Sequence, residues 1–290
     1  MLKIKVPASS ANLGCGFDSL GLALKLNNTF IFEKSASFAL QGFDSSKLED
    51  NLVYQSYHYV FEYLKKKVIP VIITLEEAQI PISRGLGSSA SCIVAGVYAA
   101  NYFLDFILSE EACLSIATKI EGHPDNISAC ALGGLVSCFV KDGIVKTVSY
   151  PVSDDIFFYL AIPNFVLSTE IARNALPKKL LISDYVHSLS RAIQLPYAFS
   201  RGDIGLLRDL LDDKIHEPYR LPLIKNADKI KGDYKDLDVA IAISGAGPSL
   251  LLISKLSLSD MHFNTKKYSD WNLIAVDVSH QGVQLIPSIK

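Results

Sequence analysis

The feature that most constrains this chain is a glycine turn that opens a stretch of small apolar residues. Gly85 and Gly87 directly precede Ser88–Leu104, which is apolar nearly all round. A helix without a polar face has to be buried, so we expect this stretch to form a central helix. Its first turn would present unpaired N–H groups and the positive end of the helix dipole, an arrangement that favours phosphate. A serine-capped glycine turn without any ligand is the competing interpretation, and local chemistry alone does not decide between the two.

The loop differs from the two best-known phosphate-binding motifs. No lysine follows Gly87, so this is not the Walker A loop, which ends in Gly-Lys-Ser or Gly-Lys-Thr. The His-Arg-Asp and Asp-Phe-Gly segments of protein kinases are also absent from the sequence. Ser88 and Ser89 nevertheless supply hydroxyls that could reach a phosphate or Mg²⁺.

Composition and charge exclude several classes of protein. The chain has 290 residues, 49% hydrophobic and 20% charged, which is typical of a folded chain of about two domains. A net charge of -2 gives no electrostatic reason to expect nucleic acid or an anionic membrane as a partner. Met1–Pro7 alternates like a strand rather than a signal peptide, and no apolar run approaches the roughly 18 residues of a membrane span. Five cysteines without CxxC pairing predict reduced thiols, and we expect a cytoplasmic protein.

Strand and helix patterns are mixed along the chain, so we expect an α+β fold. The expected strands are Leu2–Val6, Thr29–Glu33, Val71–Leu75, a hairpin of Leu135–Val140 and Ile144–Ser149, Phe157–Ile162, Val239–Ile243, Leu250–Ile253, and a last strand pair near Ile274–Val278 and Val283–Ile286. The expected helices are Asn51–Lys66, Ser88–Leu104, one from Ser109 to Gly122, and others around Tyr185–Arg201 and Ile204–Asp212. The pattern restarts near Pro151–Asp155, where we place a domain boundary.

Three further loops carry polar groups or glycines in unusual places. Asn12 and Asp18 flank a glycine bend and suit a hydroxyl or ammonium group, although an ordinary polar turn would look the same. Glu121 ends a helix on its apolar face, where the dipole disfavours an anion. We therefore expect a cation such as Mg²⁺ beside it, the alternative being a solvated carboxylate. Ser244–Ser249 holds two glycines between apolar strands, which indicates a close approach of backbones.

Together these segments resemble the signatures of the GHMP kinases, the superfamily of galactokinase, homoserine kinase, mevalonate kinase and phosphomevalonate kinase. The signatures occur in order as Asn12–Asp18, Gly85–Ala90 and Ser244–Ser249, and the resemblance runs almost end to end. It implies a two-lobed α+β GHMP kinase fold. Residues 1–152 would form a ribosomal protein S5 domain 2-like N-terminal lobe, and residues 153–290 a ferredoxin-like C-terminal lobe. It also implies ATP as co-substrate together with Mg²⁺.

Within the superfamily, four segments resemble the homoserine kinases, namely Pro7–Gly14, His123–Asn126, Ser168–Arg173 and His216–Arg220. This resemblance implies phosphorylation of the hydroxyl of L-homoserine by ATP, a step in threonine biosynthesis. A kinase for mevalonate, shikimate or another small alcohol is the nearest alternative. A GHMP-fold protein that binds ligands without turnover is the alternative from a different class. The family also suggests a homodimer.

The resemblance assigns roles to individual positions. The implied substrate-binding residues are Asn12, Asp18, Asn126, Thr169, Arg173, Arg220 and Gly247, with Asp18 and Asn126 also the candidate catalytic residues. The implied ATP-binding residues are Asn51, Val53, Pro81, Ile82, Ser83, Arg84, Gly85, Leu86, Gly87, Ser88 and Ser89, and the implied Mg²⁺ ligands are Ser88 and Glu121. An arginine can clamp the substrate carboxylate with two hydrogen bonds, while Asp18 suits the ammonium or hydroxyl end. Cys15 departs from the family pattern, which usually has proline there.

The resemblance leaves the identity of a catalytic base open. Several relatives carry an aspartate where this chain has Asn126, and an amide cannot take a proton. Either Asp18 orients the substrate hydroxyl or accepts its proton, or the proton passes to the phosphate itself. We favour positioning over general-base catalysis, since phosphoryl transfer depends mainly on alignment and charge stabilisation.

Overall fold

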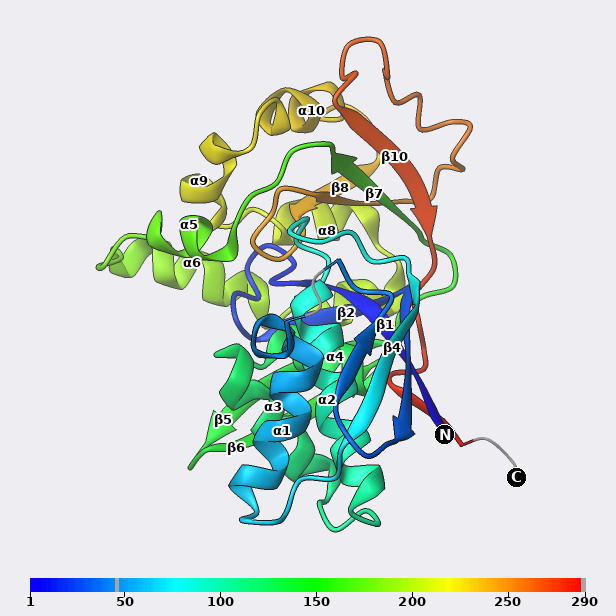
Figure 1. Cartoon of the computed structure of the whole chain (residues 1–290). Coiled ribbons are helices and arrows are strands. Elements are labelled where there is room, and N and C mark those ends of the chain that lie inside the picture. The colour runs from blue at the N-terminus through cyan, green and yellow to red at the C-terminus, as the bar shows by residue number, and fades with distance from the viewer. Residues whose placement is uncertain (45–46, 288–290) are drawn as a thin grey trace.

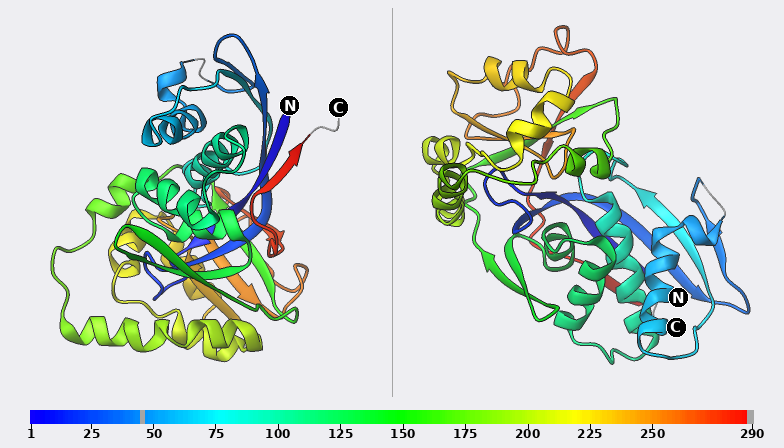
Figure 2. Two further views of the ribbon diagram at one scale, coloured as in Figure 1. Left: turned by 90° about the horizontal axis from the view of Figure 1, so that it is seen from below. Right: turned by 90° about the vertical axis from the view of Figure 1, so that its left-hand side faces the viewer.

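The computed structural model describes residues 1–44 and 47–287 of the chain. Its framework is two β-sheets with helices packed against them, which form a lower and an upper lobe in the view of Figure 1. Two further views in Figure 2 show the two lobes in contact along the middle of the molecule.

The first lobe is built on a seven-stranded sheet in which β1 and β2 are central. Its strands are β1 (Leu2–Ala11), β2 (Leu20–Lys34), β3 (Ala39–Gln41), β4 (Val71–Ala78), β5 (Leu135–Lys141), β6 (Ile144–Tyr150) and β11 (Gln284–Pro287). The order is β11-β1-β2-β4-β3, and β5 pairs with β2 and β6. The helices of this lobe are α1 (Leu52–Tyr63), α2 (Ser88–Phe103), α3 (Glu110–Glu121) and α4 (Asp125–Leu132), with a short 3₁₀ turn at Leu48–Asp50.

Strand β1 changes character along its length. Its first residues alternate, with Leu2 and Ile4 in the core and Lys3 and Lys5 half-buried, as expected for a strand with one wet face. Every residue of Val6–Ala11 is buried. This end lies where the lobes meet, since Ala8 belongs to a hydrophobic cluster that also contains second-lobe residues such as Phe158 and Phe199.

Helix α2 is the central helix of the first lobe, as the apolar stretch predicts. Most of its residues are buried, on all sides of the helix. It packs so closely on α1 that a Cβ at Gly96 would stand only 2.4 Å from the backbone oxygen of Val53. Helix α3 starts at an Ser109 cap and ends at Gly122 in the left-handed conformation, as predicted. The N-terminus of α2 lies at the boundary between the lobes, since the Ser244 hydroxyl of the second lobe donates to the Gly85 oxygen at 2.7 Å.

The second lobe is built on a four-stranded antiparallel sheet. Its strands are β7 (Phe157–Pro163), β8 (Val239–Ile243), β9 (Leu250–Ser254) and β10 (Trp271–Val276), in the order β10-β7-β9-β8. This is the strand order of a ferredoxin-like β-α-β-β-α-β unit. The helices α5 (Thr169–Asn174), α6 (Ile182–Ala192), α7 (Leu195–Arg201), α8 (Ile204–Leu210), α9 (Glu217–Arg220) and α10 (Ala227–Asp233) all lie between β7 and β8, with a 3₁₀ turn at Leu221–Leu223. Turns occupy residues 255–270, where that unit would carry its second helix.

Most of the expected elements are confirmed, including the β5–β6 hairpin, β8 and the cap of α2. The expected last strand pair is wrong, because β10 joins β7 in the second sheet whereas β11 joins β1 in the first. The α+β class is confirmed. The division into two domains after residue 152 stays a proposal. Strand β11 follows that division in the sequence but joins the sheet of the first lobe. The short elements β3, α4, α5, α9 and α10 were not predicted. Within the described parts of the chain, no helix is long and apolar enough to cross a membrane.

Candidate active site

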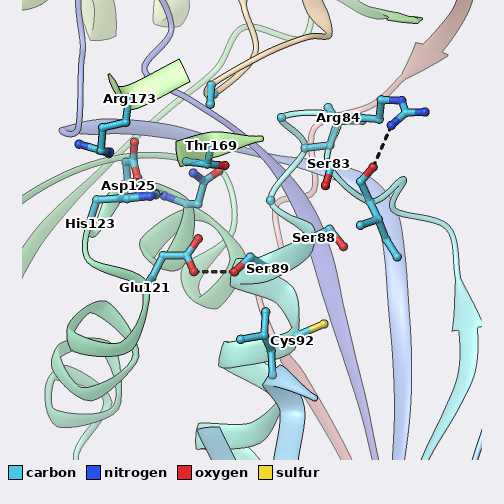
Figure 3. Close-up of a pocket in the computed structure, with 18 of the residues that line it drawn as sticks. Ser83, Arg84, Ser88, Ser89, Cys92, Glu121, His123, Asp125, Thr169 and Arg173 are labelled. Carbon is cyan, nitrogen blue, oxygen red and sulfur yellow. Dashed lines mark hydrogen bonds and ion pairs between the residues drawn. The ribbon is translucent and has the colours of Figure 1, made fainter. Parts of the chain in front are cut away.

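A cavity of about 370 Å³ lies where the N-terminus of α2 faces the second lobe. Figure 3 shows side chains from both lobes around it. The predicted site residues that line it are Asn12, Asp18, Asn51, Ile82, Ser83, Arg84, Gly85, Leu86, Gly87, Ser88, Ser89, Glu121, Asn126, Thr169, Arg173 and Arg220. The structure thus brings together residues that lie up to 208 positions apart in the sequence, from Asn12 to Arg220.

The glycine loop has the close backbone approach that its sequence predicts. Gly85 has φ of +72°, and a Cβ there would stand 2.2 Å from the backbone oxygen of Ser244. Gly87 has φ of +71° and caps α2, and a Cβ there would stand 2.1 Å from the Ser9 hydroxyl. Only glycine satisfies both the left-handed φ and the lack of space. The loop therefore opens α2 directly into the cavity, with the amides of its first turn unpaired within the helix.

Asp18 and Arg173 form a bidentate ion pair at the other end of the cavity. Both nitrogen–oxygen distances, Nη1 to Oδ2 and Nη2 to Oδ1, are 3.0 Å. Asp18 and Asn12 both have positive φ, of 53° and 69°, and the Asp18 amide donates to Asn12 Oδ1 at 3.0 Å. A non-glycine residue in the left-handed region of backbone conformation lowers the stability of the fold by roughly 1–3 kcal/mol, and such residues cluster at functional sites. The loop is thus held in a strained shape that presents the Asp18 carboxylate to the second lobe.

Arg220 is a buried cation beside this pair. It is 1% exposed, donates from Nη1 to the backbone oxygen of Gly245 at 3.1 Å, and lies 5.2 Å from the centroid of the Phe17 ring. Burial, together with the nearby charge of Arg173, lowers the pKa of Arg220 to about 10. Within the described parts of the chain, no carboxylate forms an ion pair with this guanidinium. A buried charge needs a partner, so Arg220 is suited to receive an anion from the cavity.

Glu121 is held by a serine of the helix that follows the glycine loop. Its Oε2 accepts a hydrogen bond of 2.7 Å from Ser89, while Figure 3 shows the Ser88 hydroxyl directed away from it. Burial raises the pKa of Glu121, and the Ser89 hydrogen bond partly offsets that effect. A carboxylate that loses water without gaining a cation is destabilised in its charged form, and Mg²⁺ would reverse this. The Glu121 carboxylate, with the Ser89 hydroxyl beside it, therefore fits a magnesium ion.

Two residues at the N-terminal end of α4 belong to the site but were not predicted to do so. His123 and Asp125 both line the cavity, and His123 Nδ1 lies 2.7 Å from Asp125 Oδ1. Asp125 is 1% exposed and also accepts the backbone N–H of Asn126 at 2.8 Å. The Asn126 Oδ1 in turn accepts from the Ser9 hydroxyl at 2.8 Å. The signal was present, because this segment stood out in the sequence, but only Asn126 was assigned a role.

Two of the predicted ATP-binding residues do not line the cavity. Val53 does not line the cavity, since its side chain is fully buried in the first-lobe core. Asn51 does line it, and its Oδ1 also caps α1 by accepting the amides of Val53 and Tyr54. Pro81 lies just outside the lining as well. The residues that join Asn51 there are Phe43, Asp50, Leu52 and Cys92.

Gly247 and Arg84 also differ from their predicted roles. Gly245 and Ala246 line the cavity in place of Gly247, which packs toward Ile224. Arg84 borders the cavity, but its guanidinium points away from it in Figure 3. The guanidinium donates instead to backbone oxygens of the second lobe, including that of Pro163 at 2.9 Å. Cys15 shows no sign of reactivity, because burial raises the pKa of its thiol to about 12.

The fold and the glycine-loop cavity define a GHMP-type kinase. Residues 51–134 match the GHMP kinases N terminal domain. Across its whole length the chain is 37% identical to the homoserine kinase of Clostridium beijerinckii, all of which it covers. It is 38% identical to that of Caldicellulosiruptor saccharolyticus over 97% of this chain and 96% of the relative. The chain belongs to the homoserine kinase family.

Solved structures agree with this assignment. The crystal structure of homoserine kinase from Cytophaga hutchinsonii is 28% identical, with a TM-score of 0.85 over 98% of this chain and 97% of that one. The Streptococcus pneumoniae phosphomevalonate kinase in complex with phosphomevalonate and AMPPNP is 14% identical with a TM-score of 0.75, covering 96% of this chain and all of that one. That second likeness concerns the fold alone.

Proposed function

We propose that this protein is a kinase that transfers the γ-phosphoryl group of ATP to the hydroxyl of L-homoserine. The products are ADP and O-phospho-L-homoserine, an intermediate of threonine biosynthesis. The observation that carries the proposal is the buried Arg220, which no carboxylate of residues 1–44 and 47–287 pairs with, beside the Asp18–Arg173 pair in the cavity that the glycine loop lines.

The charges of the cavity match an amino acid. Asp18 supplies a negative group and Arg173 a positive group, and the two are paired with each other. A zwitterion can insert between them, with its ammonium bound to Asp18 and its carboxylate bound to Arg173. Arg220 adds a second cation on the carboxylate side. Mevalonate and shikimate carry no ammonium group, so they would leave Asp18 without a new partner. Homoserine is therefore favoured over the other small alcohols of the superfamily.

The chemical step needs positioning more than acid–base catalysis. The homoserine oxygen attacks the γ-phosphorus, a new O–P bond forms, and the bond from phosphorus to the β,γ-bridging oxygen breaks to release ADP. Both Asp18 oxygens accept hydrogen bonds from Arg173, which leaves Asp18 better suited to orient the substrate than to take its proton. The hydroxyl proton then ends on the transferred phosphoryl group. The amides at the start of α2 stabilise the phosphate charge.

We propose Mg²⁺ as the companion of ATP, held by Glu121 with the Ser89 hydroxyl beside it, and with Ser88 as the further ligand that the family resemblance implies. The ion would supply charge neutralisation on the phosphates. Its support is the half-buried Glu121 carboxylate, whose pKa is raised by loss of water. A cytoplasmic location also remains a proposal, supported by five unpaired cysteines.

A second copy of the chain is the proposed protein partner. Helix α6 and its C-cap residue turn large apolar side chains outward, with Ile182 83% and the C-cap Ile193 73% exposed. Figure 2 shows this helix at the outer edge of the second lobe. Exposed apolar patches of this kind mark interaction surfaces. We propose that α6 pairs with its counterpart in a symmetric dimer.

The first test of the proposed function is a coupled assay of ADP release with Mg·ATP and a panel of alcohols. The panel contains L-homoserine, L-serine, mevalonate, shikimate and galactose. Turnover selective for homoserine is expected. Selective turnover of mevalonate or shikimate would keep the ATP site and overturn the substrate. ATP binding without turnover of any alcohol would favour a ligand-binding protein without catalysis.

A further inference from the structure

Arg84 connects the glycine loop to the segment that carries the substrate-binding helix. Its Nε donates to the backbone oxygen of Pro163 at 2.9 Å, and its Nη2 donates to that of Asn164 at 3.0 Å. Its Nη1 donates back to Ile82 in its own loop at 3.1 Å. The Leu167 amide adds a longer contact of 3.4 Å to the Ser83 oxygen. One guanidinium thus joins two stretches of backbone about 80 residues apart in sequence.

The segment that Arg84 holds leads directly into the substrate side of the cavity. Pro163 ends β7, and Ser168 caps α5 by accepting the Ile171 amide at 3.1 Å. Helix α5 carries Thr169 and Arg173, both of which line the cavity. Any shift of residues 163–168 therefore moves the Arg173 guanidinium relative to Asp18.

The other side of the glycine loop reaches the remaining substrate residues. The Ser244 hydroxyl donates to the Gly85 oxygen at 2.7 Å. The next residue, Gly245, accepts on its backbone oxygen from Asn12 Nδ2 at 2.7 Å and from Arg220 Nη1 at 3.1 Å. The loop that is proposed to hold the ATP phosphates is thus bonded on both sides to backbone that positions substrate groups.

We infer that Arg84 is a positioning residue that couples the two substrates, so that a bound nucleotide increases the affinity for homoserine. This inference rests on the proposed function. Arg84 acts through backbone carbonyls, because its side chain points away from the cavity and donates three hydrogen bonds to main-chain oxygens. A nucleotide that orders the loop also orders residues 163–168, and α5 is then held in place before homoserine arrives. Such coupling between two sites is typically about 5- to 150-fold in affinity.

Arg84→Lys separates a geometric role from a role of charge. Lysine keeps the positive charge but cannot donate to three carbonyls in the planar arrangement of a guanidinium. The control is Arg191→Lys, since Arg191 likewise donates to backbone oxygens, of Asp209 and His187 at 3.1 Å each, and does not line the cavity. Binding of homoserine is measured by calorimetry with and without a non-hydrolysable ATP analogue.

In the unmutated protein and in Arg191→Lys, the analogue is expected to tighten homoserine binding by at least about 5-fold. In Arg84→Lys this ratio is expected to fall toward one, while the affinity for the analogue alone changes by less than about 3-fold. An unchanged ratio would overturn the inference. If Arg84→Lys instead mainly lowers the affinity for the ATP analogue alone, Arg84 is an ATP ligand and the inference is wrong. Homoserine turnover of the unmutated protein is measured first, so a failure of the proposed function is seen separately.

A second measurement does not depend on the folding of a variant. Hydrogen exchange of the unmutated protein is followed with the ATP analogue alone. Exchange of the amides of residues 164–176 is expected to slow, because the Leu167 amide is bonded to the glycine loop. No change in this segment, together with protection of the loop itself, would contradict the coupling.

Discussion

At the scale of single residues, Asp18 carries the clearest prediction about the substrate. Asp18→Asn keeps the shape of the side chain but removes the charge that would bind the ammonium group. A hydrogen bond to a charged group contributes about 1.5–3 kcal/mol, so the KM for homoserine is expected to rise roughly 10- to 100-fold. Steady-state kinetics check this, with the exposed Asp154→Asn as control. A similar kcat in Asp18→Asn would confirm positioning, whereas a loss of several orders of magnitude would make Asp18 the base.

His216 carries a prediction about pH. It is fully buried, its Nε2 lies 2.8 Å from the Gly14 oxygen, and Asp213, Glu217 and Arg220 surround it. Burial lowers the pKa of His216 below its usual 6.5, against the opposing effect of Asp213. The unfolded chain therefore binds a proton near pH 6.5 that the folded chain rejects, so the free energy of unfolding falls as the pH falls below that value.

The variant His216→Gln isolates this contribution. Its slope of unfolding free energy against pH, between pH 7 and the pKa of the folded state, is expected to be shallower by up to about 1.4 kcal/mol per pH unit. Urea titrations at several pH values measure both slopes. Identical slopes would show that the imidazole titrates alike in the folded and unfolded chains.

At the scale of elements, the glycine loop predicts a large effect from one methyl group. Gly85→Ala places a Cβ 2.2 Å from the Ser244 oxygen, so the loop has to move away from the second lobe. Gly143 is a matched control because its φ of +75° is similar and a Cβ there would meet nothing within 4 Å. Gly143→Ala is expected to lower the free energy of unfolding by about 1–2 kcal/mol and to leave the KM for ATP unchanged. Gly85→Ala is expected to cost more stability and raise the KM for ATP at least about 10-fold, and equal effects of the two variants would contradict this account.

The elements also show how far sequence reasoning reached. The cap of α2, the ends of α3 and the β5–β6 hairpin were predictable because their signals are local, namely glycine turns, a serine cap and alternation. Val53 was predicted to bind ATP, whereas its side chain lies in the core. The buried positions Val53, Tyr57 and Val60 follow one helix face, and this periodicity would have placed the side chain there. The partner of β11 depends on which sheet edge is open, and a short strand carries no such information.

The site shows the same limit. The loops around Asn12, Gly85 and Glu121 were recognisable because their glycines and polar groups have few structural uses. The direction of Arg84 was not, since its acceptors are backbone oxygens about 80 residues away that only the packing of the two lobes brings near. The contact of Glu121 with Ser89 rather than Ser88 depends on the rotation of α2 by one residue, which the sequence does not specify.

At the scale of the whole molecule, α6 predicts the oligomeric state. An amphipathic helix normally turns its apolar face inward, yet α6 turns Ile182, Val186, Leu189 and Ile193 outward. In an antiparallel pair of α6 helices, a two-fold axis brings residues at equal distances on either side of it face to face. Ile182 and Ile193 have the same midpoint along the helix as Val186 and Leu189. Ile182 would therefore face the partner's Ile193, and Val186 the partner's Leu189. None of these four residues is charged, so the symmetry brings no like charges together in the stripe.

A mass twice that of the 31.8 kDa chain is therefore expected by sedimentation equilibrium at micromolar concentration. Val186→Asp is expected to give monomers, because the two-fold axis would bury two carboxylates near each other without partners. Val148→Asp, a similarly exposed valine on β6, is expected to leave the dimer intact, since it lies on the other lobe. A monomeric unmutated protein would refute the pairing outright. A dimer that survives Val186→Asp would place the interface elsewhere and leave α6 as the surface for a different partner.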